Sequence, residues 1–131
     1  MIVGSVKVDI APGELIDKIT ILSIKSERMK DLKKLENVRQ ELDILLETRD
    51  RAVQPSETLK ALTLKLKEVN ERLLTTEDSI RDCEAAGDFG ARFIDLARAI
   101  YQNNDERASL KREINHLLGS QLIEEKSYKP Y

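Results

Sequence analysis

An unbroken run of apolar positions from Leu59 to Cys83 places the strongest constraint on the fold of this chain. The steps alternate between three and four residues, at Leu59, Leu62, Leu66, Val69, Leu73, Thr76, Ile80 and Cys83. This spacing puts every position on one face of an α-helix, whereas the side chains of a strand repeat every two residues. Because such a stripe must be covered, the pattern predicts a helix packed against other helices.

Similar stripes lie on both sides of this helix. The first boundary contains Pro55, which cannot continue a helix, and the second contains Gly87, which can adopt the left-handed conformation that ends one. The sequence therefore predicts an all-α fold within a single domain of residues 1–131. Its three long antiparallel helices form a coiled-coil-like bundle over residues 13–53, 56–86 and 89–118.

The stripe within residues 13–53 changes phase between Met29 and Leu35, where Leu32 makes two successive steps of three residues. A phase change of this kind locally overwinds a helix pair. We interpret it as a bend, or as a change of packing partner, within one continuous helix.

Two short segments flank the predicted helices. Within residues 1–12, three β-branched residues alternate with charged ones and predict a short β-strand: Val6, Val8 and Ile10. A strand needs a partner, either the C-terminal stretch near Leu122–Tyr128 or the same strand of a second chain. The remaining residues, 119–131, form a short polar tail.

A helix over residues 13–53 would be roughly 60 Å long, against roughly 45 Å for each of the other two. Its N-terminal end would extend beyond its partners and expose Leu15, Ile16, Ile19 and Ile21. An apolar patch of this kind needs cover, and pairing of two identical surfaces is the commonest solution. The sequence therefore predicts a homodimer, with another protein as a further possible partner.

The charge pattern and the rare residues exclude several classes of function. The net charge is -2, with 22 basic and 24 acidic residues thoroughly mixed, so no nucleic-acid partner is expected. No apolar run is long enough for a membrane helix. Cys83 and His116 are the only cysteine and histidine, and no phosphate-binding glycine loop is present. We therefore predict a cytoplasmic protein with no disulfide, no metal and no cofactor, in which Cys83 belongs to the core.

Polar residues interrupt the apolar stripe of the third predicted helix. Lys111 falls on that stripe, and a buried lysine needs an acidic partner. The candidate polar cluster comprises Glu14, Asp17, Lys18, Tyr101, Asn104, Asp105, Arg107, Lys111, Asn115, Glu124, Glu125 and Lys126. Two interpretations are open: a structural network of ion pairs, or a pocket for a small anion with Arg107 and Lys111 as donors.

Three asparagines are expected at a similar height in the three helices: Asn37, Asn70 and Asn104. A polar layer of this kind fixes the register of packed helices at a cost in stability. The alternative is that the layer reaches a cleft and binds a ligand.

Three stretches resemble a family of small bacterial helical proteins of unknown function. They are the opening Gly13–Leu22 (GELIDKITIL), the stretch Tyr101–Asn115 with its Asn-Asp, Arg-Ala, Lys and Ile-Asn positions, and the closing Glu124–Tyr128 (EEKSY). The resemblance covers essentially the whole chain. It implies a bacterial or phage origin and a cytoplasmic protein, and some relatives occur near genes for surface-glycan synthesis.

Two functions fit these observations. The favoured one is a homo-oligomeric interaction or scaffold module, which predicts no deep pocket and an aliphatic interface around Leu15–Leu22. The alternative is a small enzyme or binding protein for a phosphate- or carboxylate-bearing molecule. That second function predicts a concave site where the polar cluster converges.

Overall fold

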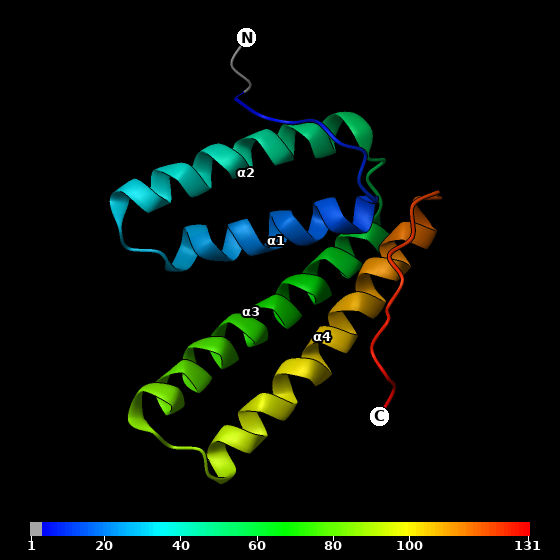
Figure 1. Ribbon diagram of the computed structural model, residues 1–131. Coiled ribbons are helices and arrows are strands. Elements are labelled where there is room, and N and C mark those ends of the chain that lie inside the picture. The colour runs from blue at the N-terminus through cyan, green and yellow to red at the C-terminus, as the bar shows by residue number, and fades with distance from the viewer. Residues whose placement is uncertain (1–3) are drawn as a thin grey trace.

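The computed structural model describes residues 4–131, and within that range it contains four α-helices and no strand. The helices form two hairpins, made by α1 (Pro12–Arg28) with α2 (Leu32–Ala52) and by α3 (Glu57–Ala86) with α4 (Ala91–Leu117). Helix α1 lies between α2 and the α3–α4 hairpin and packs on all three other helices (Figure 1). The prediction of an all-α fold is confirmed, whereas the prediction of three helices and a strand is wrong.

Helix α3 forms as its apolar stripe predicts. At its start, the hydroxyl of Ser56 accepts a hydrogen bond from the N–H of Leu59 at 3.1 Å. At its end, Gly87 has a φ of 67°, the left-handed conformation that glycine adopts without strain. Leu66 and Val69 on the stripe are buried against the rest of the chain.

The predicted helix over residues 13–53 is two helices, because the backbone leaves the helical conformation at Met29 (φ -74°, ψ 133°). Asp31 then begins α2, since its carboxylate accepts hydrogen bonds from the N–H groups of Lys33 at 3.0 Å and Lys34 at 3.1 Å. The chain reverses here without Pro or Gly. The phase change in the stripe marked this place, and the capping residue Asp31 is the signal that predicts a new helix.

Replacing Asp31 with Ala is expected to lower the free energy of unfolding by about 1 kcal/mol, because two N–H groups at the start of α2 lose their acceptor. Asp43→Ala is a matched control, since Asp43 is an exposed carboxylate in the middle of the same helix. That control should change stability by less than about 0.5 kcal/mol. Urea unfolding measures both variants, and equal losses would contradict a capping role.

The predicted strand within residues 1–12 is wrong for its described part, and residues 1–3 lie outside the described range. Residues 6–10 belong to no helix or strand, and Val6 and Val8 are 80% and 71% exposed. Alternating β-branched residues favour an extended backbone, but a strand also needs a hydrogen-bonded neighbour. The C-terminal stretch that was expected to supply one runs along α4 instead (Figure 1).

The apolar start of α1 is covered within the chain itself. Leu15, Ile16 and Ile19 are only 5%, 1% and 5% exposed, because α2 folds back over α1 while α3 and α4 cover its other sides. The expected overhang is therefore wrong, and the argument that placed a dimer interface there loses its premise. The buried cluster comprises Leu15, Ile16, Ile19, Leu59, Leu66, Val69, Leu73, Leu110 and Ile114.

Candidate functional site

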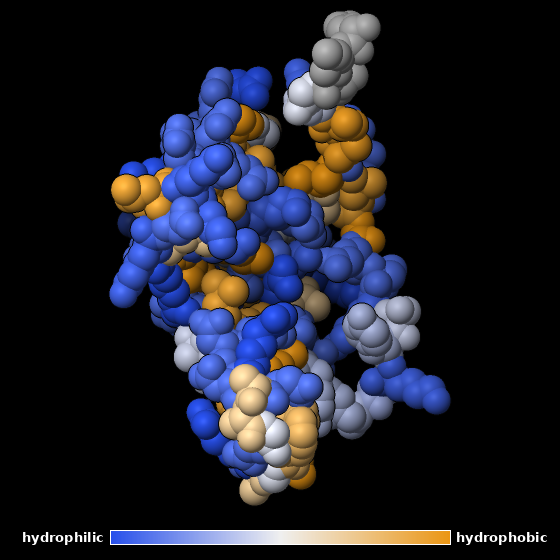
Figure 2. Space-filling model, turned by 60° about the vertical axis from the view of Figure 1, so that its left-hand side comes forward, coloured by the Kyte–Doolittle hydropathy of each residue, from blue (hydrophilic) through white to orange (hydrophobic). Residues whose placement is uncertain are grey.

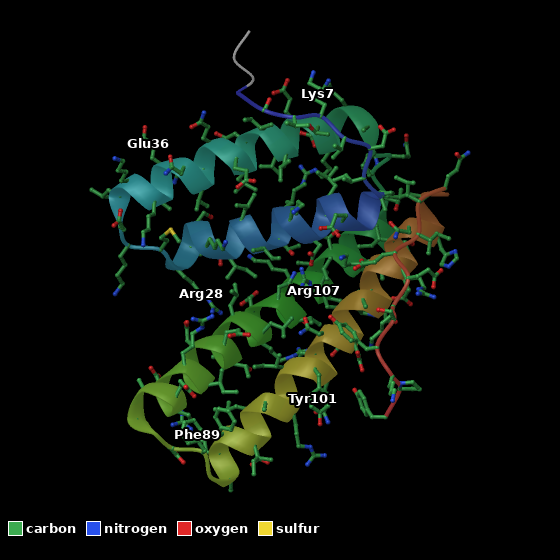
Figure 3. All side chains as sticks on the ribbon, viewed as in Figure 1. Lys7, Arg28, Glu36, Phe89, Tyr101 and Arg107 are labelled. Atoms are coloured by element: carbon green, nitrogen blue, oxygen red, sulfur yellow. The ribbon has the colours of Figure 1, made fainter. Side chains whose placement is uncertain are left out.

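Helix α4 presents Arg107, Lys111 and Asn115 on one face, because residues four positions apart lie one turn apart along a helix. The first turns of α1 lie against this face. Each of the three side chains therefore binds a residue of α1. Figure 3 shows Arg107 where α4 passes close to α1.

Asp17 is the most deeply buried charged residue of this contact, with an exposed fraction of 1%. Its Oδ1 accepts hydrogen bonds from Nε of Arg107 and from Nδ2 of Asn70, both at 2.9 Å, and its Oδ2 accepts from Nη2 of Arg107. The amide of Asn70 also donates to the hydroxyl of Thr20 at 2.9 Å. These bonds join α1, α3 and α4 at one point.

Burying a carboxylate is costly unless a counter-charge and hydrogen bonds replace the lost water. Asp17 receives both, because the guanidinium of Arg107 binds its two oxygens and the amide of Asn70 donates a further hydrogen bond. Within residues 4–131, no buried side-chain nitrogen or oxygen atom lacks a hydrogen-bond partner. The network around Asp17 is therefore complete, and the removal of any one member would leave another unsatisfied.

Lys111 lies one turn further along α4 and is 7% exposed. Its Nζ lies 2.8 Å from Oε2 of Glu14 on α1 and 2.7 Å from Oε2 of Glu124 in the C-terminal tail. The lysine on the apolar stripe thus has the acidic partners that the sequence required. It links the start of α1 to the tail through α4.

Both cations of this face hold their protons more tightly than usual. The hydrogen bonds to Asp17 raise the pKa of Arg107, although its partial burial acts in the opposite direction. Burial by itself would lower the pKa of Lys111, but the hydrogen bonds and charges of Glu124 and Glu14 outweigh that effect and raise it. Arg107 and Lys111 are therefore positively charged at neutral pH.

The raised pKa of Lys111 makes its contribution to stability depend on pH in one direction. The contribution is fully present below the unfolded-state value of about 10.4 and is lost as the pH rises through the higher folded-state value. We expect the difference in unfolding free energy between the natural chain and Lys111→Met to be constant from about pH 7 to 9 and to shrink above about pH 10.4. Urea unfolding across this range measures it, and a decline that is complete by pH 9 would contradict the assignment.

Gly13 allows α1 to approach α4 closely. Its N–H donates to Oδ1 of Asn115 at 2.7 Å. A Cβ atom at this position would overlap the backbone carbonyl of Lys111 and would lie 2.8 Å from Oδ1 of Asn115. The close approach is therefore available only to glycine, and it places Glu14 and Asp17 within reach of the cations of α4.

The C-terminal tail crosses the outer side of this face and leaves a groove of about 660 Å³ between itself and α4. Ion pairs hold the tail in place: Lys126 with Asp105, and Arg112 with Glu125 at 3.7 Å. The guanidinium of Arg112 also donates to the backbone carbonyl of Glu124 at 3.3 Å. Residues of α4 and of the stretch 124–128 form the two walls.

Most of the predicted polar cluster meets at this groove or directly beneath it: Glu14, Asp17, Asn104, Asp105, Arg107, Lys111, Asn115, Glu124, Glu125 and Lys126. Two members lie at its margin. Lys18 is exposed, with Nζ 3.7 Å from Oε1 of Glu14. The ring of Tyr101 packs edge-on against Tyr131, with 5.2 Å between ring centroids.

The expected layer of three asparagines is wrong. Asn70 is 2% exposed, whereas Asn37 and Asn104 lie at the surface. The reversal after α1 places Asn37 on α2, whose backbone lies against α1 and not against α3 or α4. Asn70 bonds to Asp17 and Thr20 instead of to other asparagines.

Three residues of the network were not among the predicted site residues: Gly13, Thr20 and Asn70. A signal for two of them exists, because Gly13, Asp17, Thr20 and Ile24 follow one another in steps of four, three and four residues and are all buried. A search for apolar residues alone misses this stripe, since its first three members are small or polar. The buried face of α1 is therefore wider than its aliphatic residues indicate.

Within residues 4–131, no cluster of His, Cys, Asp and Glu side chains suits a metal ion, and no helix has the length and hydropathy of a membrane span. One family model, described as a family of unknown function (DUF6165), matches residues 6–131. No curated protein and no solved structure matches the chain. The expectation of an uncharacterised family is thus confirmed, while the bacterial origin stays a prediction.

Proposed function

The chain belongs to this family of unknown function, and from the geometry of the groove we propose that it binds a small anionic molecule between α4 and the C-terminal tail. One observation carries the proposal. Three hydrogen-bond donors stand one turn apart on α4, each held by α1 on one side and bordering the groove on the other. Two of them carry a positive charge, and such a row suits the oxygens of a carboxylate or phosphate.

Each donor has capacity left after its contact with α1. Arg107 uses Nε and Nη2 for Asp17, and its Nη1 makes no hydrogen bond to any residue between 4 and 131. Asn115 uses Oδ1 for Gly13, and its Nδ2 donates to nothing in the same range. Lys111 has three ammonium protons for two carboxylate partners. A ligand could therefore be bound without loss of the contacts that hold the helices together.

The carboxylate of Glu124 indicates where the charged group of a ligand would lie. It lies 2.7 Å from Nζ of Lys111, yet its side chain is 61% exposed and belongs to the tail rather than to a helix. The exposed carboxylate of Glu124 can be hydrated when it leaves, whereas the buried Lys111 needs an anion in its place. A ligand anion can therefore replace Glu124 on Lys111, and the tail closes the outer side of the groove.

The electrostatics favour binding over proton transfer. A general base must lose its proton near neutral pH, but the pKa of Lys111 is raised and that of Arg107 is raised as well. Both side chains are therefore better suited to bind an anion as fixed positive charges than to transfer a proton. We therefore favour a binding protein over an enzyme for this groove.

The surface on which the scaffold hypothesis was based is not exposed. Its interface was expected around Leu15–Leu22, and the aliphatic residues of that stretch are buried or half-buried within the same chain. A homodimer remains a proposal, but a different surface must form it.

A titration with four probes tests the proposal: inorganic phosphate, citrate, a hexose 1-phosphate and a nucleoside diphosphate. The resemblance to proteins encoded near genes for surface-glycan synthesis makes the sugar phosphate the first of these to test. At least one probe should raise the melting temperature and give a measurable heat of binding. Lys111→Met should weaken that binding at least about tenfold, because a charge-assisted hydrogen bond is lost.

Lys67→Met is the matched control, since Lys67 forms an ion pair with Glu27 at 2.6 Å but does not line the groove. This variant should retain full affinity, and far-UV circular dichroism verifies that both variants are folded. Glu124→Ala should act in the opposite direction and tighten binding by up to about fivefold, because it removes the competing carboxylate. The proposal fails if no probe binds, or if the two lysine variants weaken binding equally.

A further inference from the structure

A second concave surface shares no lining residue with the groove beside Lys111. It is a hollow of about 340 Å³ between α1, the C-terminal end of α2 and the start of α3, and we refer to it as the α1–α2–α3 hollow. Ile16, Ile19 and Leu59 form its floor and are only 1%, 5% and 6% exposed, and Leu64 stands at its edge with an exposed fraction of 57%. Neither α4 nor the C-terminal tail lines this hollow. It is therefore independent of the proposed anion site.

The same chain carries an apolar segment with no cover. Val6, Val8 and Ile10 are 80%, 71% and 40% exposed and alternate along the chain with charged residues. No backbone hydrogen bond joins residues 4–10 to the rest of the described chain. In Figure 2 the start of the described chain is a hydrophobic column that stands apart from the neighbouring surface, and in Figure 3 Lys7 and Arg107 lie on opposite sides of α1.

We infer that residues 6–10 of a second copy of the chain occupy the α1–α2–α3 hollow, and that two copies exchange these segments reciprocally. Three branched apolar side chains in a row match an apolar hollow, and their burial supplies the driving force. An exchange of identical segments between two identical hollows forms a closed two-fold dimer.

The charges at the two surfaces agree with this pairing. Asp9 lies within the segment and Lys60 lines the hollow, and neither has an ion-pair partner within residues 4–131. The other charged pair of the rim, Arg49 with Asp50, is already satisfied at 2.9 Å. The segment thus brings an acidic group to the lysine of the rim that lacks one.

The joint between the segment and α1 has a defined local geometry, and the segment lies outside the hollow of its own chain. Ala11 is extended (φ -65°, ψ 144°), as expected for a residue that precedes proline, and Pro12 fixes the next φ. The carbonyl of Ala11 also accepts a hydrogen bond from the N–H of Glu14 at 3.0 Å, which fixes its orientation. Val6 and Val8 are 80% and 71% exposed and do not line the hollow, so the segment does not fill the hollow of its own chain.

Sedimentation equilibrium of the full chain tests the inference. The natural chain should be a dimer, and Val8→Asp in the segment or Leu64→Glu at the rim should each weaken dimerisation at least about tenfold. Leu32→Asp is the matched control, because Leu32 is 81% exposed at the start of α2 and lies outside both surfaces. A natural chain that stays monomeric at high micromolar concentration overturns the inference, as does an equal effect of the control.

Two further experiments identify the contact itself. Asp9→Lys should weaken the dimer by about two- to fivefold, and Lys60→Asp in the same chain should restore it.

When chains carrying Val8→Cys are mixed with chains carrying Leu64→Cys, oxidation should link one chain of each kind. Cys83 is 2% exposed and does not compete. A link that forms only when both cysteines are in one chain would show that the segment fills its own hollow, and the exchange would be refuted.

Discussion

Gly13→Ala is expected to lower the free energy of unfolding by at least about 2 kcal/mol. In a helix, alanine is usually better than glycine by up to about 1 kcal/mol. Here the added Cβ would overlap the backbone carbonyl of Lys111, and a packed helix backbone cannot move aside as a flexible side chain can. Overpacking typically costs about 1–3 kcal/mol and more where nothing can yield, so the clash outweighs the gain.

Two variants isolate the cause of this loss. Gly4→Ala has nothing within 4 Å of the new Cβ and should leave stability unchanged. Asn115→Ala combined with Gly13→Ala removes the side-chain part of the clash but leaves the carbonyl in place, so it should restore nothing. Recovery of stability in the double variant, measured by urea unfolding, would show that the side chain of Asn115 was the obstacle.

The helices that could be predicted are those whose ends are marked by local chemistry. In α3, an unbroken apolar stripe coincides with a capping serine at one end and a left-handed glycine at the other. The turn between α1 and α2 is marked only by Asp31 and a phase change, since it contains neither Pro nor Gly. The chain reverses at this weak local signal because the reversal lets Leu42, Leu45 and Leu46 of α2 pack against the core.

The polar cluster was predictable because its chemistry requires partners. A lysine on an apolar stripe needs a carboxylate, and Lys111 has one on α1 and another in the tail. The choice of partner for Arg107 could not be derived in the same way, since several acids were within possible reach. It depends on the close approach at Gly13, which is a property of the packed backbone rather than of local sequence.

The prediction of an asparagine layer was wrong for a related reason. Its heights were counted along a single first helix, and the reversal at Met29 moves Asn37 to a helix whose backbone lies against α1 and not against α3 or α4. Errors in a helix boundary thus affect every long-range contact inferred from it. The positions of Glu14 and Asp17 were not affected, because α1 begins at Pro12, close to the predicted residue 13.

Asp17→Asn is expected to destabilise the chain by about 2–4 kcal/mol. The substitution keeps the shape of a carboxylate that is 1% exposed but removes its charge, and so leaves the guanidinium of Arg107 without a counter-charge. The loss of one partner from a fully buried pair costs about 3–5 kcal/mol, and the 30% exposure of the Arg107 side chain reduces that figure. Glu106→Gln is the control, because its pair with Arg72 is half exposed and should contribute less than about 1 kcal/mol.

Arg107→Met in the Asp17→Asn background separates the structural role of this pair from its proposed role in binding. The double variant should regain at least about 1 kcal/mol over Asp17→Asn alone, since the unpaired charge is removed and an amide at position 17 can still bond to Asn70. Affinity for the anionic probe should nevertheless stay low, because the free Nη1 donor of Arg107 is gone. If stability and affinity recover together, Arg107 contributes to binding only by holding α1 in place. If stability recovers and affinity does not, the guanidinium contacts the ligand directly.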